Sequence, residues 1–265
     1  MNRLAIMPYL NTRIYMHHGP PAGCELEGRA PNQVMAALHS GRCVAGLVPV
    51  GALPAALQQL EFLDRYGIAC AGPVRSVALF SKRALETLTP RSRIALSADS
   101  VTSVGLLRLL LGDCLGFDRL PKFVAPDAPA DAQLLIGDKA LLRSVQGLDR
   151  HVSDLSQLWM DAHRLPFVFA RWMVRRDAPT ALREKLSAWL ASLMENQSLL
   201  CRITARCDSA NYGLPRAIVE KYLRGIRGVI GAAELRGQAL YLAELERHAP
   251  VAQAPPSSRL EYAFP

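Results

Sequence analysis

A strand pattern runs almost directly into a helix pattern in Gln-Leu-Leu-Ile-Gly-Asp-Lys-Ala-Leu-Leu-Arg-Ser-Val, residues 133–145. Residues 133–136 form the short apolar run of a buried strand, and residues 139–145 repeat apolar side chains at helical spacing. Gly137 and Asp138 lie at the junction. Asp138 is expected to cap the helix, and the loop backbone is the alternative point of contact with a ligand.

The same alternation continues on both sides of this stretch. Further strands are predicted at residues 4–7, 44–48, 74–80, 93–96 and 122–125, and further helices at 31–40 and 102–111. Strands that alternate with helices favour parallel sheets with right-handed crossovers, so the fold class is α/β. The last third changes character, because 180–196, 215–226 and 232–248 are helix patterns without predicted strands between them.

Two changes in composition suggest that the chain forms two lobes. Polar residues interrupt the apolar rhythm at 81–92, and a second break comes at 172–179. We therefore expect a discontinuous first lobe, residues 1–88 with 172–265, and a second lobe, residues 89–171, inserted into it. The carboxyl ends of parallel strands would then face a ligand cleft between the lobes. The segment 249–258, rich in Ala, Pro and Ser, predicts a loose tail.

The charge balance is basic, with 31 Lys and Arg against 23 Asp and Glu in 265 residues, a net charge of +8. The basic residues are scattered, and Arg91/Arg93 and Arg175/Arg176 are their densest pairs. A nucleic-acid partner is not expected, because no basic run with interleaved aromatic residues is present. The composition favours a basic surface around a small acidic ligand.

The N-terminus and the cysteines both predict a cytoplasmic protein. Residues 3–7 pass at once into a loop at Pro8, without the cleavage site of a secretory signal. The six cysteines form no CxxC pair, which favours reduced thiols. No membrane span is expected, since Arg108 interrupts the most apolar stretch, residues 104–111.

Residues 97–104 follow a predicted strand and open a Leu-rich helix. The N–H groups at the start of a helix are unpaired, and with the Thr102 and Ser103 hydroxyls they form a site suited to a carboxylate. Asp99 or Ser100 is expected to cap the same helix. Two interpretations stay open, a cap alone or a cap together with an anion site.

The stretch Gly72-Pro73-Val74-Arg75-Ser76-Val77 places a basic and a hydroxylic residue at the start of a strand. Adjacent side chains of a strand point to opposite faces, so Arg75 and Ser76 cannot both face one cleft unless a bulge intervenes. Asn11 follows the first strand, where its amide holds a substrate hydroxyl or forms a turn. Phe169 belongs to a buried strand pattern whose aromatic side chains could also wall a flat ligand.

Several familiar kinds of site are excluded by spacing. His17 and His18 are neighbours without an i, i+4 partner, so no metal site is expected there. The chain has no GxGxxG, no GxxxxGK[ST] and no GxSxG motif. Dinucleotide, nucleoside triphosphate and serine-hydrolase functions therefore have no support.

Taken in order, six motifs resemble the chorismate dehydratase family of menaquinone biosynthesis by the futalosine route. They are residues 8–11, 72–77 with 79–82, 102–104, 134–141, 154–155 with Trp159, and 165–170. The likeness covers about residues 3–175. The chain departs from the family at residues 12–14, where a small residue and Pro are usual, and at Leu158, where Glu is usual.

The resemblance implies a fold, a reaction and a set of site residues. The fold is the two-lobed one of type II periplasmic solute-binding proteins, and the reaction removes water from chorismate to give 3-[(1-carboxyvinyl)oxy]benzoate without a metal or organic cofactor. Ser76 and Asn11 match the family's polar active-site positions, and Thr102 and Ser103 match its carboxylate-binding turn. The substrate-binding set is completed by residues within the matched motifs: Arg75, Gly137, Asp138 and Phe169.

Two other functions remain open. The departures from the family suit a non-catalytic or diverged protein that binds a small aromatic or acidic carboxylate. A sibling family, 1,4-dihydroxy-6-naphthoate synthase, shares the fold and the Thr-Ser turn. That family typically carries a His-Glu pair where this chain has Gly137-Asp138, and its histidine would serve as a base. The absence of that pair favours the dehydratase branch.

Overall fold

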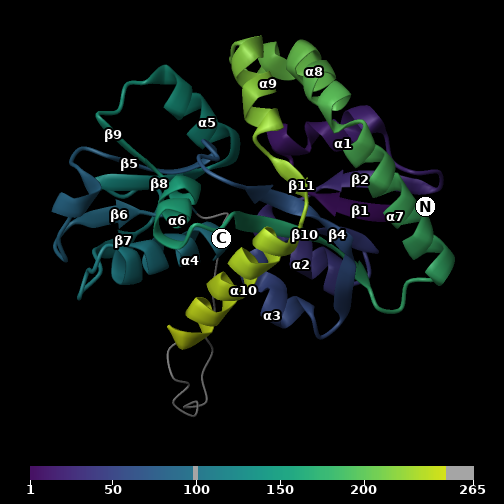
Figure 1. Cartoon of the computed structure of the whole chain (residues 1–265), viewed down its shortest axis with the longest axis horizontal. Coiled ribbons are helices and arrows are strands. Elements are labelled where there is room, and N and C mark those ends of the chain that lie inside the picture. Colours follow the sequence, from purple (N-terminus) through teal and green to yellow (C-terminus); the bar gives the residue numbers. More distant parts are fainter. Residues whose placement is uncertain (98–100, 249–265) are drawn as a thin grey trace.

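The computed structural model describes residues 1–97 and 101–248. Asp99 and Ser100, the expected helix caps, and the predicted tail at 249–258 lie outside these residues. The described chain forms two lobes that lie side by side, each built around its own sheet (Figure 1). The predicted α/β class is confirmed.

The larger lobe surrounds a six-stranded sheet of order β11-β4-β10-β3-β1-β2. Its strands are β1 (Asn2–Ile6), β2 (Cys24–Gly28), β3 (Ala45–Pro49), β4 (Leu60–Cys70), β10 (Phe167–Arg175) and β11 (Arg227–Val229). Its helices are α1 (Arg13–His18), α2 (Pro31–His39), α3 (Leu53–Ala56), α7 (Thr180–Glu195), α8 (Gln197–Asp208) and α9 (Arg216–Arg224), with short 3-10 turns η1 (Leu10–Thr12), η2 (Val50–Ala52) and η5 (Ser209–Tyr212).

The smaller lobe surrounds a five-stranded sheet of order β7-β6-β8-β5-β9. Its strands are β5 (Val77–Ser81), β6 (Arg93–Ala95), β7 (Lys122–Val124), β8 (Ala132–Ile136) and β9 (His151–Asp154). Its helices are α4 (Val101–Leu109), which continues into a π-helical turn η4 (Leu110–Cys114), α5 (Gly137–Gln146) and α6 (Leu155–His163), with a 3-10 turn η3 (Leu85–Thr87).

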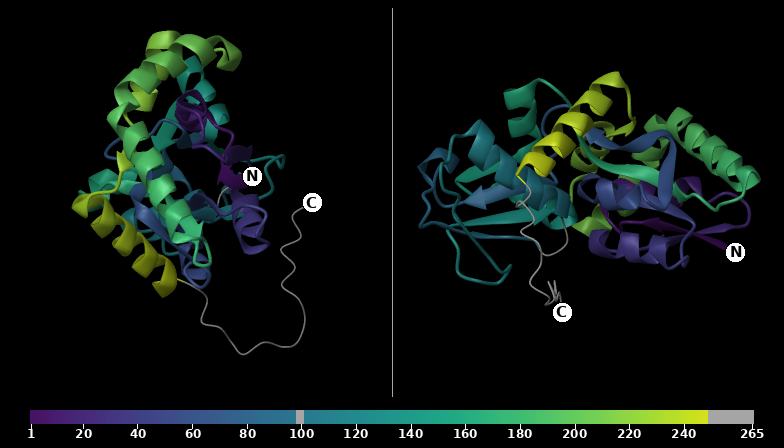
Figure 2. Two further views of the ribbon diagram at one scale, coloured as in Figure 1. Left: turned by 90° about the vertical axis from the view of Figure 1, so that its right-hand side faces the viewer. Right: turned by 90° about the horizontal axis from the view of Figure 1, so that it is seen from below.

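The last described helix, α10 (Ala232–Arg247), lies across the junction of the lobes (Figures 1 and 2). It packs against β10 and η2 of the larger lobe and against α4 of the smaller one. Aromatic side chains fill this junction: Phe167 of β10 and Trp159 of α6 both lie edge-on to Tyr241 of α10, at centroid distances of 5.0 and 6.2 Å. The helix therefore ties the two lobes together.

The sheets differ from the expected parallel arrangement. In the larger sheet β10 runs antiparallel to both β3 and β4, and in the smaller sheet β5 runs antiparallel to both β8 and β9. Each of these strands is the first one after the chain changes from one sheet to the other, so neither closes a local βαβ unit. The last third also holds a strand, β11, between α9 and α10, and an additional helix, α8.

The chain does not pass from one sheet to the other at the lobe boundaries expected at 88/89 and 171/172. Strand β5 already belongs to the smaller sheet, and β10 belongs to the larger sheet from Phe167 onward. The polar break at 81–92 therefore follows the end of a strand and is not a crossing. We propose that the chain crosses between lobes at 71–76 and 164–166.

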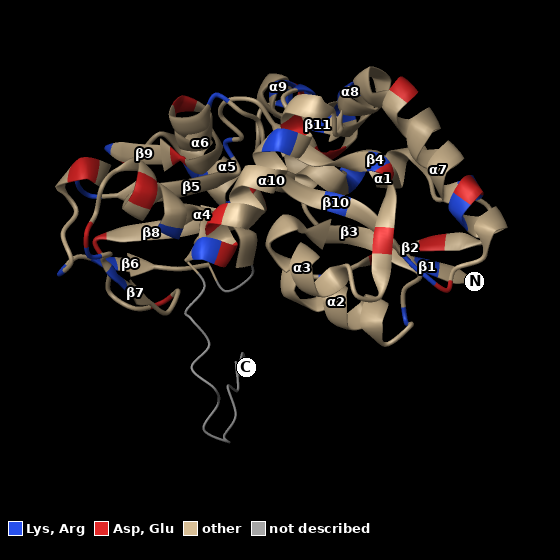
Figure 3. Cartoon of the chain, turned by 60° about the horizontal axis from the view of Figure 1, so that its bottom comes forward, with Lys and Arg blue, Asp and Glu red and all other residues tan. Residues whose placement is uncertain are grey.

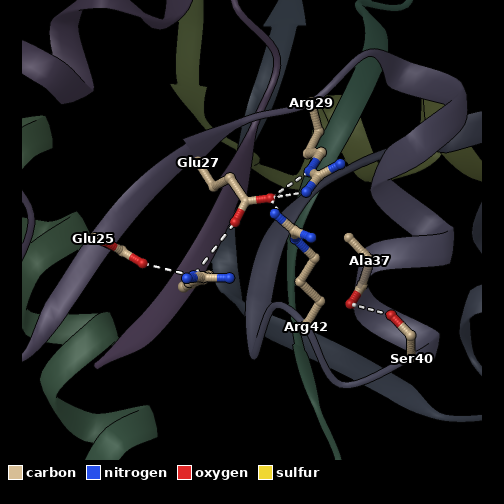
Figure 4. A network of polar contacts seen from close by, with 7 residues as sticks. Glu25, Glu27, Arg29, Ala37, Ser40 and Arg42 are labelled. Carbon is tan, nitrogen blue, oxygen red and sulfur yellow. Dashed lines mark hydrogen bonds and ion pairs between the residues drawn. The ribbon is translucent and has the colours of Figure 1, made fainter.

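Charged side chains cover the exposed edge of the larger sheet. Strand β2 lies at that edge, and the Glu27 carboxylate contacts Arg29, Arg42 and Arg3, while Arg3 also pairs with Glu25 at 2.6 Å (Figure 4). Charge on an edge strand disfavours pairing with another chain. Among the described helices none is long and apolar enough to cross a membrane.

Candidate active site

Asn11 lies in the 3-10 turn that directly follows strand β1. Pro8 lacks an N–H and ends the strand, and the chain then turns through η1. The Thr12 hydroxyl closes this turn, because it donates to the main-chain oxygens of Met7 and, at 2.8 Å, of Tyr9. Thr12 occupies one of the positions where the sequence departs from the resembling family, and here it stabilises the turn that presents Asn11.

Ser76 is held at the entrance to β5 by main-chain contacts on both sides. The Asp154 carboxylate, at the end of β9, accepts from the N–H groups of Val74 and Arg75 at 3.2 and 2.5 Å. The Ser76 carbonyl accepts from the N–H of Gly137 at 2.7 Å. Arg75 adopts a positive φ of 65°, a conformation that non-glycine residues rarely take and that interrupts the strand alternation. Ser76 is consequently buried, with 3 % of its surface exposed.

The start of helix α4 is anchored to the larger lobe and to α10. The Thr102 hydroxyl accepts from the Gly51 N–H at 3.0 Å, and the Thr102 carbonyl accepts from the Tyr241 hydroxyl at 2.9 Å. A Cβ atom at Gly51 would lie only 3.2 Å from the Thr102 backbone, so glycine permits this close approach. Thr102 and Ser103 are each 3 % exposed.

Gly137 and Asp138 form a second contact between the lobes. Gly137 has a φ of 61°, and a Cβ atom there would lie 2.7 Å from the Tyr9 ring, so the ring packs directly on the glycine. Asp138 accepts from the Leu10 N–H at 2.9 Å. Burial raises the pKa of Asp138 from 3.8 to about 6, although the Leu10 hydrogen bond opposes the shift. Asp138 does not cap α5 as expected, because its carboxylate reaches across to the other lobe.

These four segments surround one cavity of about 540 Å³, counting its open mouth, at the junction of the lobes. Its lining is Met7, Tyr9, Asn11, Pro31, Pro49, Ile68, Val74, Ser76, Val77, Thr102, Ser103, Ile136, Gly137 and Phe169. Apolar walls with a few convergent polar groups are typical of a small-molecule site. Six of the eight site residues chosen from the sequence thus line one cavity: Asn11, Ser76, Thr102, Ser103, Gly137 and Phe169.

Arg75 and Asp138 do not line this cavity. Asp138 is engaged with Leu10, as described above, and Arg75 lines a neighbouring hollow together with Lys221 and Tyr222. Strand geometry predicts that only one of Arg75 and Ser76 can face the cleft. Ser76 is the one that lines the cavity. The positive φ of Arg75 interrupts the strand alternation directly before Ser76.

The Tyr222 hydroxyl lies next to Ser76 and Asn11. Burial raises the pKa of Tyr222 far above its usual value, and the neighbouring Ser76 and Asn11 side chains oppose the shift. Among the described residues, neither the Tyr222 hydroxyl nor the Asn11 amide oxygen has a partner with good hydrogen-bond geometry, although the Ser76 and Asn11 side chains are close to the Tyr222 hydroxyl. A buried polar atom without a partner is costly, and of the two such atoms the Asn11 oxygen belongs to a residue that lines the cavity.

The described lining carries hydroxyl and amide groups but no charged side chain and no histidine or cysteine. It offers no set of metal ligands. The basic surface expected around an acidic ligand is therefore absent from the described cavity wall. A carboxylate bound here would be stabilised by hydrogen bonds from neutral groups at the start of α4.

Sequence reasoning missed the residues that hold the site in place. Asp154 was expected only as part of a motif, and Tyr222 and Tyr241 lie in helices α9 and α10, which carry no local motif. The sequence does place both tyrosines on apolar helix faces, and a hydroxyl buried there needs a hydrogen-bond partner. That partner could not be read from the sequence, because Tyr241 and Thr102 are 139 residues apart.

Solved structures similar to this chain share its fold at low sequence identity. A protein from Archaeoglobus fulgidus superposes with a TM-score of 0.68 at 16 % identity, over 92 % of this chain and 96 % of that one. The periplasmic aliphatic sulphonate binding protein of Escherichia coli gives 0.66 at 17 %, over 93 % and 90 %. The alkanesulfonate-binding protein of Xanthomonas axonopodis pv. citri gives 0.64 at 18 %, over 94 % of both chains. The expected two-lobed periplasmic-binding-protein fold is confirmed.

Sequence comparison reaches further than the fold. A chorismate dehydratase of Thermus thermophilus is 32 % identical over 192 residues, which cover 63 % of this chain and 67 % of that protein. A family model described as menaquinone biosynthesis matches residues 2–247, nearly the whole described chain. The resemblance noted from the six motifs is thereby confirmed, and the chain belongs to this menaquinone-biosynthesis family.

Proposed function

We propose that this protein removes water from chorismate to give 3-[(1-carboxyvinyl)oxy]benzoate. The observation that carries the proposal is the single cavity on which Asn11, Ser76, Thr102 and Ser103 converge from both lobes. The 32 % identity to a chorismate dehydratase supports the same reaction. The site lies at the junction of two lobes, so a bound substrate would be enclosed and water excluded.

The cavity suits an acidic ring compound. One substrate carboxylate would accept hydrogen bonds from Thr102, Ser103 and the first N–H groups of α4. The ring would lie against Phe169 and the apolar wall, and the ring hydroxyl would approach Asn11 and Ser76. Binding both ends of the substrate fixes its orientation before reaction, which is the larger part of the catalytic task here.

The elimination balances without a cofactor. The ring C–H bond next to the hydroxyl-bearing carbon breaks, its proton passes to the substrate's own enolpyruvyl carboxylate, and its electron pair completes the aromatic ring. The C–O bond breaks, and the departing hydroxide takes up that proton to leave as water. Ser76 and Asn11, with Tyr222 behind them, would stabilise the charge that develops on the leaving oxygen. Aromatisation supplies the driving force, so a strong protein base is not required.

Gly137 supports the dehydratase over the sibling synthase. An imidazole at this position would need a Cβ atom 2.7 Å from the Tyr9 ring and a backbone φ of 61°. Tyr9 would have to move to admit it. The pocket is therefore shaped around a glycine, and its described lining holds no histidine that could act as the base of the sibling reaction.

The deciding experiment incubates purified protein with chorismate and follows the aromatic product by chromatography and absorbance. We expect product with the wild type and much less with Ser76→Ala at the same concentration. Turnover of a cyclic futalosine instead of chorismate would assign the sibling activity. Tight calorimetric binding of chorismate without turnover would assign a non-catalytic binding protein.

A further inference from the structure

Side chains with metal-ligand chemistry gather where the end of α10 meets the smaller lobe. Asp113, Glu244 and His248 each place one donor atom within 4.8 Å of the other two, the one such group among the described residues. The His248 Nε2 and Asp113 Oδ2 atoms are 2.8 Å apart. Glu244 and His248 are four residues apart and so share one helix face. Asp113 lies in the π-helical turn η4, a distortion often found at functional sites.

Glu244 is the buried member of this group. Its side chain is 12 % exposed, and its Oε2 atom is fully buried and accepts no hydrogen bond from a described residue. Arg247 comes within 2.6 Å of that oxygen, but its side chain is 66 % exposed and its orientation does not form a hydrogen bond. A second carboxylate, that of Asp113, lies alongside. Arg247 is the cation now paired with Glu244, and a metal ion bound between the two carboxylates would replace it.

Two further donors lie beside the group. The Cys114 Sγ and His163 Nε2 atoms are 3.5 Å apart, and the charges of Asp113 and Glu244 act on both side chains. The Trp159 ring packs on His163 at a centroid distance of 4.1 Å and fixes its orientation.

We propose that Asp113, Glu244 and His248 bind a divalent ion of the zinc class, with Cys114 and His163 as close neighbours of the site. The mixture of carboxylate and imidazole ligands favours Zn²⁺, whereas Mg²⁺ and Ca²⁺ prefer all-oxygen sites. None of these residues lines the substrate cavity as described, so the ion would be structural. The inference therefore stands independently of the proposed reaction.

The position of the ion gives it a defined effect. Its ligands come from η4, from α10 and from His248, the residue that follows α10, so an ion would fasten the end of α10 to the smaller lobe. Figure 3 marks acidic and basic residues in red and blue along this end of α10, next to α4. Tyr241 lies three residues before Glu244 and holds the Thr102 carbonyl at 2.9 Å. Metal binding would thus stabilise the junction of the lobes.

The test uses untagged, metal-stripped full-length protein, titrated with ZnCl₂ and separately with MgCl₂ by calorimetry and thermal melting. We expect one zinc equivalent and a rise in Tm of about 5–10 °C at a hundredfold excess over the dissociation constant. His248→Ala and Glu244→Gln should each weaken zinc binding by more than about tenfold, since losing even a residue that only hydrogen-bonds to a ligand costs about 10–100-fold. Exposed residues supply matched controls, His39→Ala and Glu246→Gln, which should bind zinc like the wild type.

Three results would overturn the proposal. They are the absence of saturable zinc binding, equal zinc binding by the wild type and both ligand variants, and binding of Mg²⁺ as tight as that of Zn²⁺. Circular dichroism of each variant establishes that it is folded. If Glu244→Gln does not fold, His248→Ala decides alone, since its side chain is 48 % exposed.

Discussion

The main-chain N–H of Leu10 donates a 2.9 Å hydrogen bond to the carboxylate of Asp138, which is 128 residues away and belongs to the other lobe. Directly beside this bond the Tyr9 ring packs on Gly137. A second bond, from Gly51 to Thr102, joins the lobes on another side of the cavity. The cavity walls are thus linked by contacts of one lobe with the other, and changes at these contacts should alter both stability and substrate binding.

Asp138 should make stability depend on pH between about 4 and 6. Burial raises its pKa in the folded protein from 3.8 to about 6, so the folded state holds the proton more tightly than the unfolded state. Its contribution to stability is therefore greatest below pH 4 and is lost as pH rises through 6. Asp138→Asn removes this loss. Between pH 4 and pH 7 we therefore expect the free energy of unfolding of the variant to rise by up to about 3 kcal/mol relative to that of the wild type.

The measurement is chemical denaturation of wild type and variant at several pH values. Asp118→Asn, at an exposed position, is the matched control and should retain the wild-type dependence. A parallel pH dependence in the wild type and in Asp138→Asn would show that Asp138 ionises in the folded protein as it does in the unfolded chain.

Gly137→Ala should destabilise the protein more than Gly147→Ala. The two glycines have nearly equal φ values of 61° and 63°, so the backbone strain of roughly 1–2 kcal/mol is common to both. Only at Gly137 does the added methyl group meet the Tyr9 ring, and overpacking adds about 1–3 kcal/mol. Denaturation midpoints compare the two variants directly. Equal losses would mean that Tyr9 moves aside freely.

The sequence predicted the parts of the site that depend on local pattern. The junction of β8 with α5 and the opening of α4 each follow a short apolar strand, where a turn or helix start is the natural place for polar side chains. Asn11, Thr102, Ser103 and Gly137 come from such points, whereas Ser76 precedes a strand and Phe169 lies within one. Asp138 was assigned correctly to the junction, but its partner Leu10 comes from a distant segment that no local pattern can identify.

The strands that were missed explain the rest of the difference. In β2 the charged Glu25 and Glu27 interrupt the apolar run, because this strand lies at the sheet edge. In β4, from Leu60 to Cys70, polar residues occupy the middle where the strand bulges, at Asp64, which has a φ of 52°. Antiparallel pairing of β5 and β10 depends on which lobe each strand joins, a long-range property.

Ser76→Ala and Asn11→Ala should each lower kcat for chorismate by about a hundredfold, the usual effect of removing one preorganised hydrogen-bond donor. Both side chains line the cavity, and neither anchors a helix. Ser156→Ala is the matched control, because Ser156 is a fully buried serine whose hydroxyl has no partner among the described residues. It should keep wild-type turnover. Retained turnover in Ser76→Ala would assign Ser76 a structural role.

Tyr222→Phe should separate activity from stability. Its hydroxyl has no described hydrogen-bond partner, so its removal should change the free energy of unfolding by less than about 1 kcal/mol or raise it. The same hydroxyl lies beside Ser76 and Asn11, so kcat should fall by roughly tenfold, the scale of one weakened hydrogen bond. A loss of stability with normal kcat would show that the hydroxyl serves only packing.

Thr102 should act on substrate binding, and two further variants separate this role from its structural one. Thr102→Val removes both the acceptor for the Gly51 N–H and a donor to a substrate carboxylate, whereas Tyr241→Phe loosens the same helix start but keeps the Thr102 hydroxyl. A carboxylate bound alike in the ground and transition states contributes to KM rather than kcat. We therefore expect Thr102→Val to raise KM about tenfold or more with little change in kcat.

Thr102→Ser should restore KM, and Tyr241→Phe should mainly lower Tm. If Thr102→Val lowers Tm as Tyr241→Phe does and leaves KM unchanged, the hydroxyl serves the lobe junction and not the substrate.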